Sequence, residues 1–414
     1  MPAPAEDRPR LRPLEGYPVD KNGQKLLALR DPSGLSPNVA HLPALAAAVL
    51  QLCDGRSSRD EICKEFEQRY KRSLTRAALD GLLLQLDSAL LLDSVAFREH
   101  SARVFGEFAR GDARAPLHAG KSYPTDKREL TELLDRCFEK PYGPSRPTVG
   151  DAPLPKAIIA PHIDFQRGGP AYAWAYRPLL ATSELPELIV VFGTDHNGAD
   201  HPFTLTKKHY DTPLGRVTTD GALVDLLHER GGETLFVDEH HHRGEHSLEF
   251  QAVWLRYLYG EKLDAIPTLP ILCGSLHDFM DDGSRTTTDP ADAADVGGFL
   301  HALTDAVKGR RVLWIAGADL AHVGPRFGDE KPLSAEDRAS LERRDQVTLK
   351  LAAAGDANGW FAEIKRERDV RRVCGLTPIY ALLRAAQPGK GLLASYGQCP
   401  AEEGSVVSIA SLVY

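Results

Sequence analysis

The chain has 414 residues, 42% hydrophobic and 26% charged, an ordinary globular composition with enough length for two domains. The formal net charge of −8 argues against a nucleic-acid partner, because phosphate binding needs a basic face. We find no apolar run long enough to cross a bilayer, and the Pro-rich start lacks the apolar core of a secretory signal. The six cysteines are scattered without a CxxC pair, which is typical of a cytoplasmic protein.

The N-terminal part predicts a small α+β domain. Residues 1–16 are expected to form a flexible lead, and residues 17–95 the domain itself. A short strand begins near Lys25 and ends in a turn over residues 31–34. Three helical patterns and a strand-like LLLDS follow, and the second helix opens with a capping box at residues 58–61. This order is typical of a winged-helix-like domain.

Winged helices often bind DNA, but the third helical pattern has no excess of Lys or Arg. The order of elements and the turn over residues 52–55 (LCDG) resemble the PqqD-type peptide-recognition domain. That resemblance implies docking of a peptide or a protein. A purely structural role is the alternative.

Residues 96–113 are expected to link this domain to a second one over residues 114–414. In the second domain strand-like and helical runs alternate, which predicts a mostly parallel sheet covered by helices on both faces. The expected strands are residues 156–160, 187–193, 266–273, 310–318 and 405–414. The expected helices include residues 246–259, 292–308, 334–353 and 376–386.

Polar residues follow three of these strands directly. His162 and Asp164 follow the first, His196 follows the second, and Asp319 and His322 follow another. In open α/β sheets the ligand crevice lies at the carboxyl ends of the strands, so we expect these side chains to converge. Taken singly, each histidine is as readily a partly exposed polar residue, and Asp319 a cap on the segment that follows it.

Two further polar groups stand at the starts of helices, Glu245 with His246 and, separately, Cys374. A cysteine at a helix N-terminus feels the positive end of the dipole, which favours the thiolate needed for metal binding or nucleophilic attack. The alternative for Cys374 is a small buried hydrophobe. Ser247 lacks the strand-elbow context of a hydrolase serine, which argues against a serine triad.

A run of three histidines precedes Glu245. His242 is expected to support the pocket, whereas His240 and His241 are expected to be solvated loop residues.

The second domain resembles the Memo family, whose bacterial members are called AmmeMemoRadiSam system protein B. The resemblance rests on several strings in the same order and spacing: APHIDFQRGGPAYAWAY, FGTDHNG, TPLGRVTTD, EHSLEFQ, GADLAHVGPRFGD and CGLTPIYALL. It implies an α/β sandwich similar to class III extradiol dioxygenases. By position it implies metal ligation by His162, His196 and Cys374. The other pocket residues that it implies are His246, Asp319 and His322, with Glu245 as a supporting acid.

This chain departs from the family pattern at PHIDF, where many members read PHAGY. Asp164 therefore adds a carboxylate that is expected to orient His162 or to change the substrate. The family name also implies radical-SAM and AMMECR-type proteins as partners. A PqqD-like N-terminal domain would deliver a peptide or dock a radical-SAM partner.

Three functions remain open at this point. The first is a metal-dependent redox enzyme of dioxygenase type, in which His246 or His322 acts as acid or base and Asp319 orients an imidazole. Two imidazoles and a carboxylate suit Fe(II), whereas a thiolate in place of the carboxylate also accepts Cu or Zn. The second function is a non-catalytic adaptor that binds metal or peptide. The third is a hydrolase or transferase with Cys374 as nucleophile and His322 as base.

Overall fold

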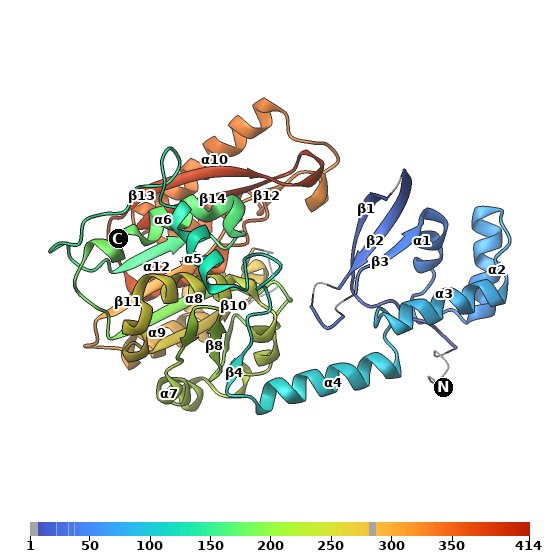
Figure 1. Ribbon diagram of the computed structural model, residues 1–414, viewed down its shortest axis with the longest axis horizontal. Helices are drawn as coiled ribbons and strands as arrows, with labels where there is room; N and C mark the ends of the chain where they lie inside the picture. Colours follow the sequence, from blue (N-terminus) through green and yellow to red (C-terminus); the bar gives the residue numbers. More distant parts are fainter. Residues whose placement is uncertain (1–6, 22, 32, 37, 281–286) are drawn as a thin grey trace. The chain divides into compact units, whose positions relative to one another are not determined.

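The computed structural model describes residues 7–414 except 22, 32, 37 and 281–286. The chain divides into two compact units, Met1–Gly111 and Asp112–Tyr414. Figure 1 shows both units. Among the described residues, no helix is both long enough and apolar enough to cross a membrane.

The first unit contains a three-stranded antiparallel sheet in the order β1-β2-β3, followed by helices. Buried apolar side chains of the helices, such as Ile62, Phe66 and Leu83, form its core. Ser58 and Glu61 form the predicted capping box. The elements are β1 (Glu15–Lys21), β2 (Gln24–Arg30), β3 (Ala40–Pro43), α1 (Ala44–Leu50), α2 (Arg59–Tyr70), α3 (Arg76–Ser88) and α4 (Val95–Arg110).

Two expectations for this unit were wrong in part. The described end of the expected flexible lead is held in place, since the Leu11 amide donates to the Cys53 carbonyl at 2.9 Å and Arg12 pairs with buried Asp31 at 3.0 Å. No closing strand forms at LLLDS in the described chain. Leu92 makes a single β-bridge to Leu11. The segment cannot continue as a strand, because Ser94 is the N-cap of α4, which begins at Val95. The expected linker is helical over most of its length, as α4.

The second unit is built on one large sheet. In the described part of the chain its strands lie in the order β12-β14-β5-β11-β6-β10-β7, and β13 pairs with β14. The central strands β5, β11, β6 and β10 are parallel, whereas β14 and β7 run antiparallel to their neighbours. The strands are β5 (Ala157–Ala160), β6 (Leu188–Thr194), β7 (Phe203–Leu205), β10 (Thr268–Cys273), β11 (Val312–Gly317), β12 (His322–Val323), β13 (Leu392–Pro400) and β14 (Val406–Val413).

The prediction of an α/β fold with a mostly parallel sheet is therefore confirmed. The expected strand at residues 405–414 forms β14, which is antiparallel to β5, and β13 was not predicted. A second, small sheet joins β4 (Ala113–Arg114), β8 (His209–Thr212) and β9 (Gly215–Val217).

Helices cover both faces of the large sheet, as Figure 1 shows. Tyr172 of α6 and Trp254 of α8 belong to the apolar core on one face. Leu300 of α9 and Ile379 of α12 belong to the core on the other. The helices of this unit are α5 (Lys127–Arg136), α6 (Phe165–Ala181), α7 (Gly221–Gly231), α8 (His246–Tyr259), α9 (Phe299–Ala306), α10 (Ala335–Ala353), α11 (Ala357–Arg366) and α12 (Leu376–Ala386).

Candidate metal centre

The site lies where the parallel strands end. His162 comes two residues after β5, His196 two residues after β6, and Asp319 two residues after β11. These strands are neighbours in the sheet and point the same way, so their carboxyl ends deliver the three segments to one edge. Cys374 comes to the same place from the segment just before α12.

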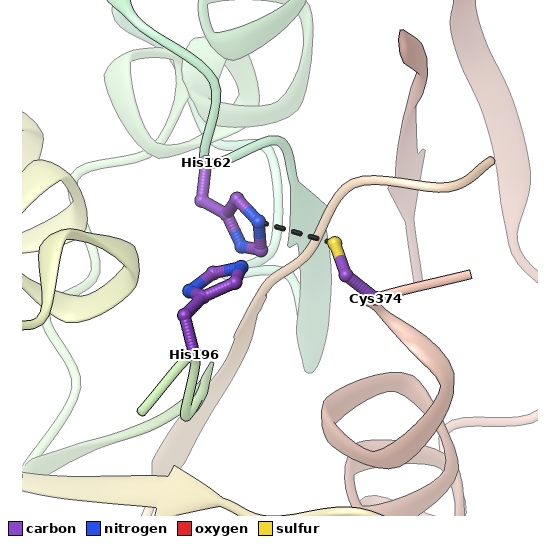
Figure 2. Close-up of side chains that lie close together, drawn as sticks. All are labelled: His162, His196 and Cys374. Atoms are coloured by element: carbon purple, nitrogen blue, oxygen red, sulfur yellow. Dashed lines mark hydrogen bonds between the residues drawn. The ribbon is translucent and has the colours of Figure 1, made fainter. Parts of the chain in front are cut away.

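His162, His196 and Cys374 converge on one point (Figure 2). One ligand atom from each lies within 4.8 Å of the other two. The Cys374 Sγ is 3.2 Å from His162 Nε2, and the two imidazole centroids are 4.9 Å apart. His162 is buried, Cys374 is half-buried and His196 is exposed, so the site opens to solvent on the side of His196.

His162 is fixed by the end of β11. Its Nδ1 lies 2.9 Å from the Gly317 carbonyl, to which it donates. Its backbone amide donates to Asp319 Oδ1 at 2.8 Å. Since Nδ1 carries the proton in this arrangement, the lone pair of a neutral His162 is on Nε2, which faces Cys374.

Glu245 performs the same task for His196. Its buried carboxylate accepts from His196 Nδ1 at 3.0 Å and from the His196 amide at 2.9 Å. It also accepts from the amides of His246 and Ser247, as the N-cap of α8. Burial opposes the charge of this carboxylate, but the neighbouring imidazoles of His196 and His246 hold the pKa of Glu245 well below its usual range.

Cys374 is held by its backbone and activated by its neighbours. The Thr194 hydroxyl donates to the Cys374 carbonyl at 3.0 Å, and the next amide, of Gly375, donates to the Asp319 carbonyl at 2.9 Å. Burial alone would raise the pKa of the Cys374 thiol. The imidazoles of His162 and His322 outweigh this effect and lower the pKa to about 6. A thiolate is therefore favoured at neutral pH.

His246 borders the three ligand side chains, with its ring 4.7 Å from that of His196 and 5.3 Å from that of His162. Burial lowers the pKa of His246 to about 4, so its imidazole is neutral. His322 is placed differently. Its Nδ1 lies 3.2 Å from the Leu320 carbonyl, and its ring is edge-on to Phe327.

Two of the expected supporting residues have other partners. Asp164 caps α6 and pairs with Arg167 at 2.6 Å, while Gly317 and Asp319 hold His162 in its place. His242 is buried between the Tyr210 hydroxyl at 2.8 Å and the Thr204 carbonyl at 3.0 Å, where burial lowers its pKa to about 3. Both side chains thus serve the local fold.

The sequence did not indicate that His118 and Glu249 support the site beside His246. The His118 ring lies 5.6 Å from that of His246, and the His118 amide donates to buried Glu249 at 3.0 Å. Glu249 also pairs with buried Arg114 and accepts from the Tyr123 hydroxyl. The sequence HAGKSYP could be placed at the start of the second domain. Its contact with EHSLEFQ could not be predicted, because the two strings are far apart in the sequence.

The donor set fits a metal ion. Both imidazoles have their Nδ1 atoms engaged, which leaves Nε2 for a ligand role, and hydrogen bonds of this kind orient metal-binding histidines. Two nitrogens and one thiolate suit iron, copper or zinc, because the soft sulfur widens the choice of metal.

The second unit is thus an α/β protein with a mostly parallel sheet and a His–His–Cys cluster at the carboxyl edge of that sheet. The Memo-like protein family matches residues 114–413, and the chain belongs to this family. The Coenzyme PQQ synthesis protein D (PqqD) family matches residues 29–92.

Relatives in other organisms are similar over most of their length. A MEMO1 family protein of Methanopyrus kandleri is 30% identical over 313 residues, 73% of this chain and 98% of that protein. MEMO1 family proteins of Aeropyrum pernix (30%; 66% of this chain, 88% of the relative) and Aquifex aeolicus (24%; 78% and 77%) are also similar. A crystal structure of an uncharacterized Escherichia coli protein matches with a TM-score of 0.34 at 16% identity, over 62% of this chain and 98% of that chain.

Proposed function

We propose that the Asp112–Tyr414 unit binds a non-haem metal ion and performs redox chemistry of the dioxygenase type. Iron(II) is the first choice and copper is the redox-active alternative, whereas zinc, which has no redox chemistry, would fit only the binding part of the proposal. The observation that carries the proposal is the convergence of His162, His196 and Cys374, whose ligand atoms lie within 4.8 Å of one another. The expected likeness to class III extradiol dioxygenases is part of this proposal.

A redox-active metal would supply electron transfer and the activation of oxygen at this position. The chain itself holds the ligands in place through Gly317 and Glu245. Neutral His246 would accept a proton at Nε2, because its Nδ1 lies 3.1 Å from Glu245. The solvent-facing side at His196 gives a substrate its approach.

Oxygen uptake by the full chain tests this function. The anaerobically purified protein would be loaded with iron(II) and given a catechol or a peptide. We expect substrate-dependent uptake that His246→Gln reduces about 100-fold or more while metal binding is retained. Uptake that does not depend on substrate or on loaded metal would overturn the redox assignment and leave a binding protein.

A second candidate is nucleophilic chemistry at Cys374. The observation in its favour is the 3.2 Å contact between the Cys374 Sγ and His162 Nε2, which resembles a cysteine–histidine pair. In this case the metal-depleted chain would hydrolyse an activated ester in a burst, and Cys374→Ser would abolish the burst. Inhibition of the same activity by chelators would count against it.

We also infer that the first unit docks a peptide or a partner, with radical-SAM and AMMECR-type proteins as the candidates. The PqqD match over residues 29–92 and the exposed apolar side chains Leu45 of α1 and Leu84 of α3 support this. Calorimetry of the full chain with such proteins from the same organism tests it. We expect Leu84→Glu to weaken binding and Val370→Glu, an exposed apolar position in the second unit, to leave it unchanged. Absence of binding by the unmodified chain contradicts the inference.

A further inference from the structure

A second group of potential ligands lies beside the first. The short 3-10 helix Glu239–Arg243 carries His240 and His241, and Asp238 precedes it. One ligand atom from each of these three residues lies within 4.8 Å of the other two. Asp238 is buried, both histidines are half-buried, and the two imidazole centroids are 4.4 Å apart. Both histidines were expected to be solvated loop residues, but they are half-buried and lie in a 3-10 helix.

The orientation of His241 resembles that of the histidines in the first site. Its Nδ1 donates to Asp195 Oδ2 at 2.8 Å, and the Asp195 side chain is fully buried. A carboxylate at Nδ1 fixes the ring and its tautomer, and leaves the lone pair of a neutral His241 on Nε2. This arrangement of carboxylate and histidine is the one commonly found behind zinc ligands.

Two carboxylates connect this group to the loop that carries His196. Asp238 belongs to the group, and Asp195 lies on the loop and accepts from His241. Asp238 Oδ2 accepts from the Asp200 amide at 3.1 Å. Asp195 Oδ1 accepts from the Asn197 amide at 2.8 Å. The second group is thus attached to both ends of the segment over residues 195–200, in which His196 lies.

We propose that Asp238, His240 and His241 form a second cation site, which takes a divalent ion of zinc type. Two imidazoles and one carboxylate are a common zinc donor set, with water as the fourth ligand. A bound ion would fix the segment over residues 238–241, which contacts the 195–200 loop through Asp238 and His241, and would thereby steady His196. The site has its own ligands, so it does not depend on the function proposed for the first.

Zinc binding by full-length chains, measured by competition with a chromophoric chelator, tests the proposal. In a His162→Ala/Cys374→Ala background, which removes the first site, we expect one zinc ion per chain. Adding Asp238→Asn and His240→Ala should remove it, whereas adding His301→Ala, at an exposed histidine on α9, should not. In the chain with an intact first site the same pair of changes should reduce two equivalents to one.

Asp195→Asn provides a milder second variant, since it preserves the shape of the side chain. We expect it to weaken zinc binding in the background by about 10–100-fold. Amide hydrogen exchange reports on the loop directly. Exchange over residues 195–200 should be slower with zinc than without it. A background chain that binds no zinc, or binds it equally well with Asp238 and His240 replaced, overturns the proposal.

Discussion

The carboxylate of Glu245 joins the start of α8 to the imidazole of His196. Its Oε1 accepts from His196 Nδ1 at 3.0 Å and from the His246 amide at 2.8 Å. One buried side chain thus caps α8 and also orients the imidazole of His196, which follows β6.

Glu245→Gln is expected to lower the metal affinity of the site by about 10–100-fold, because the amide holds the His196 imidazole less firmly. Chelator competition measures this effect. Asp164→Asn is the matched control, since Asp164 is near His162 in sequence but pairs with Arg167. Equal losses in both variants would contradict the role of Glu245.

The same variant predicts a pH dependence of stability. The folded-state pKa of Glu245 lies well below the usual value of 4.5, so its charge stabilises the fold above about pH 4.5 and the contribution is lost as the pH falls further. The difference in the free energy of unfolding between the native chain and Glu245→Gln should therefore shrink on acidification. A difference that grows below pH 4.5 would be inconsistent with the direction of this shift.

The rate of alkylation of Cys374 in the metal-free chain should be proportional to the fraction of the thiol that is ionised. With a pKa of about 6, the rate with iodoacetamide should rise with pH around a midpoint near 6. His162→Ala removes the imidazole 3.2 Å away and should move the midpoint upward, toward the ordinary value of 9.0. Mass spectrometry of the labelled peptide reports both profiles, and identical midpoints would rule out the pairing.

Gly375→Ala should disturb the site without removing a ligand. A Cβ at this position would lie 2.3 Å from the Asp319 carbonyl oxygen and 2.9 Å from the Ala318 Cβ. We expect the free energy of unfolding to fall by about 1–3 kcal/mol and metal binding to weaken. Gly221→Ala, where a Cβ meets nothing within 4 Å, should be neutral or stabilising by up to about 1 kcal/mol. Denaturant titration compares the two.

Arg371 and Arg372 offer a matched pair of ion-pair deletions. Arg371 is buried against Asp345, whereas Arg372 pairs with Asp329 at the surface. Arg371→Met should cost about 3–5 kcal/mol, because it leaves Asp345 buried without its partner. Arg372→Met should cost about 0–1 kcal/mol. Similar costs for the two would show that burial does not govern these pairs.

Sequence patterns were most informative where a property repeats along the chain. The buried runs that became β5, β11 and β6 were continuous and apolar, and parallel neighbours bring their ends together. For that reason the closeness of His162 and His196 could be expected before any coordinates.

The patterns were less informative where a contact joins distant loops. His118 lies against His246 although 128 positions separate them, and no local periodicity encodes that contact. Asp164 was expected to orient His162, which is two residues away. Its carboxylate instead caps α6 and accepts from the Arg167 amide in the first turn. β13 begins at an exposed leucine directly after a Gly-rich segment, so neither alternation nor a continuous apolar run marked its start.

Metal content of the anaerobically purified full-length chain tests the central claim most directly. We expect near-stoichiometric iron, copper or zinc at the first site, lost in His162→Ala and in Cys374→Ala. It should be retained in Cys399→Ala, whose buried thiol lies 3.7 Å from the Arg167 carbonyl. A metal content that both ligand variants leave unchanged, or the absence of metal from the unmodified chain after reconstitution, would contradict a metal centre at His162, His196 and Cys374.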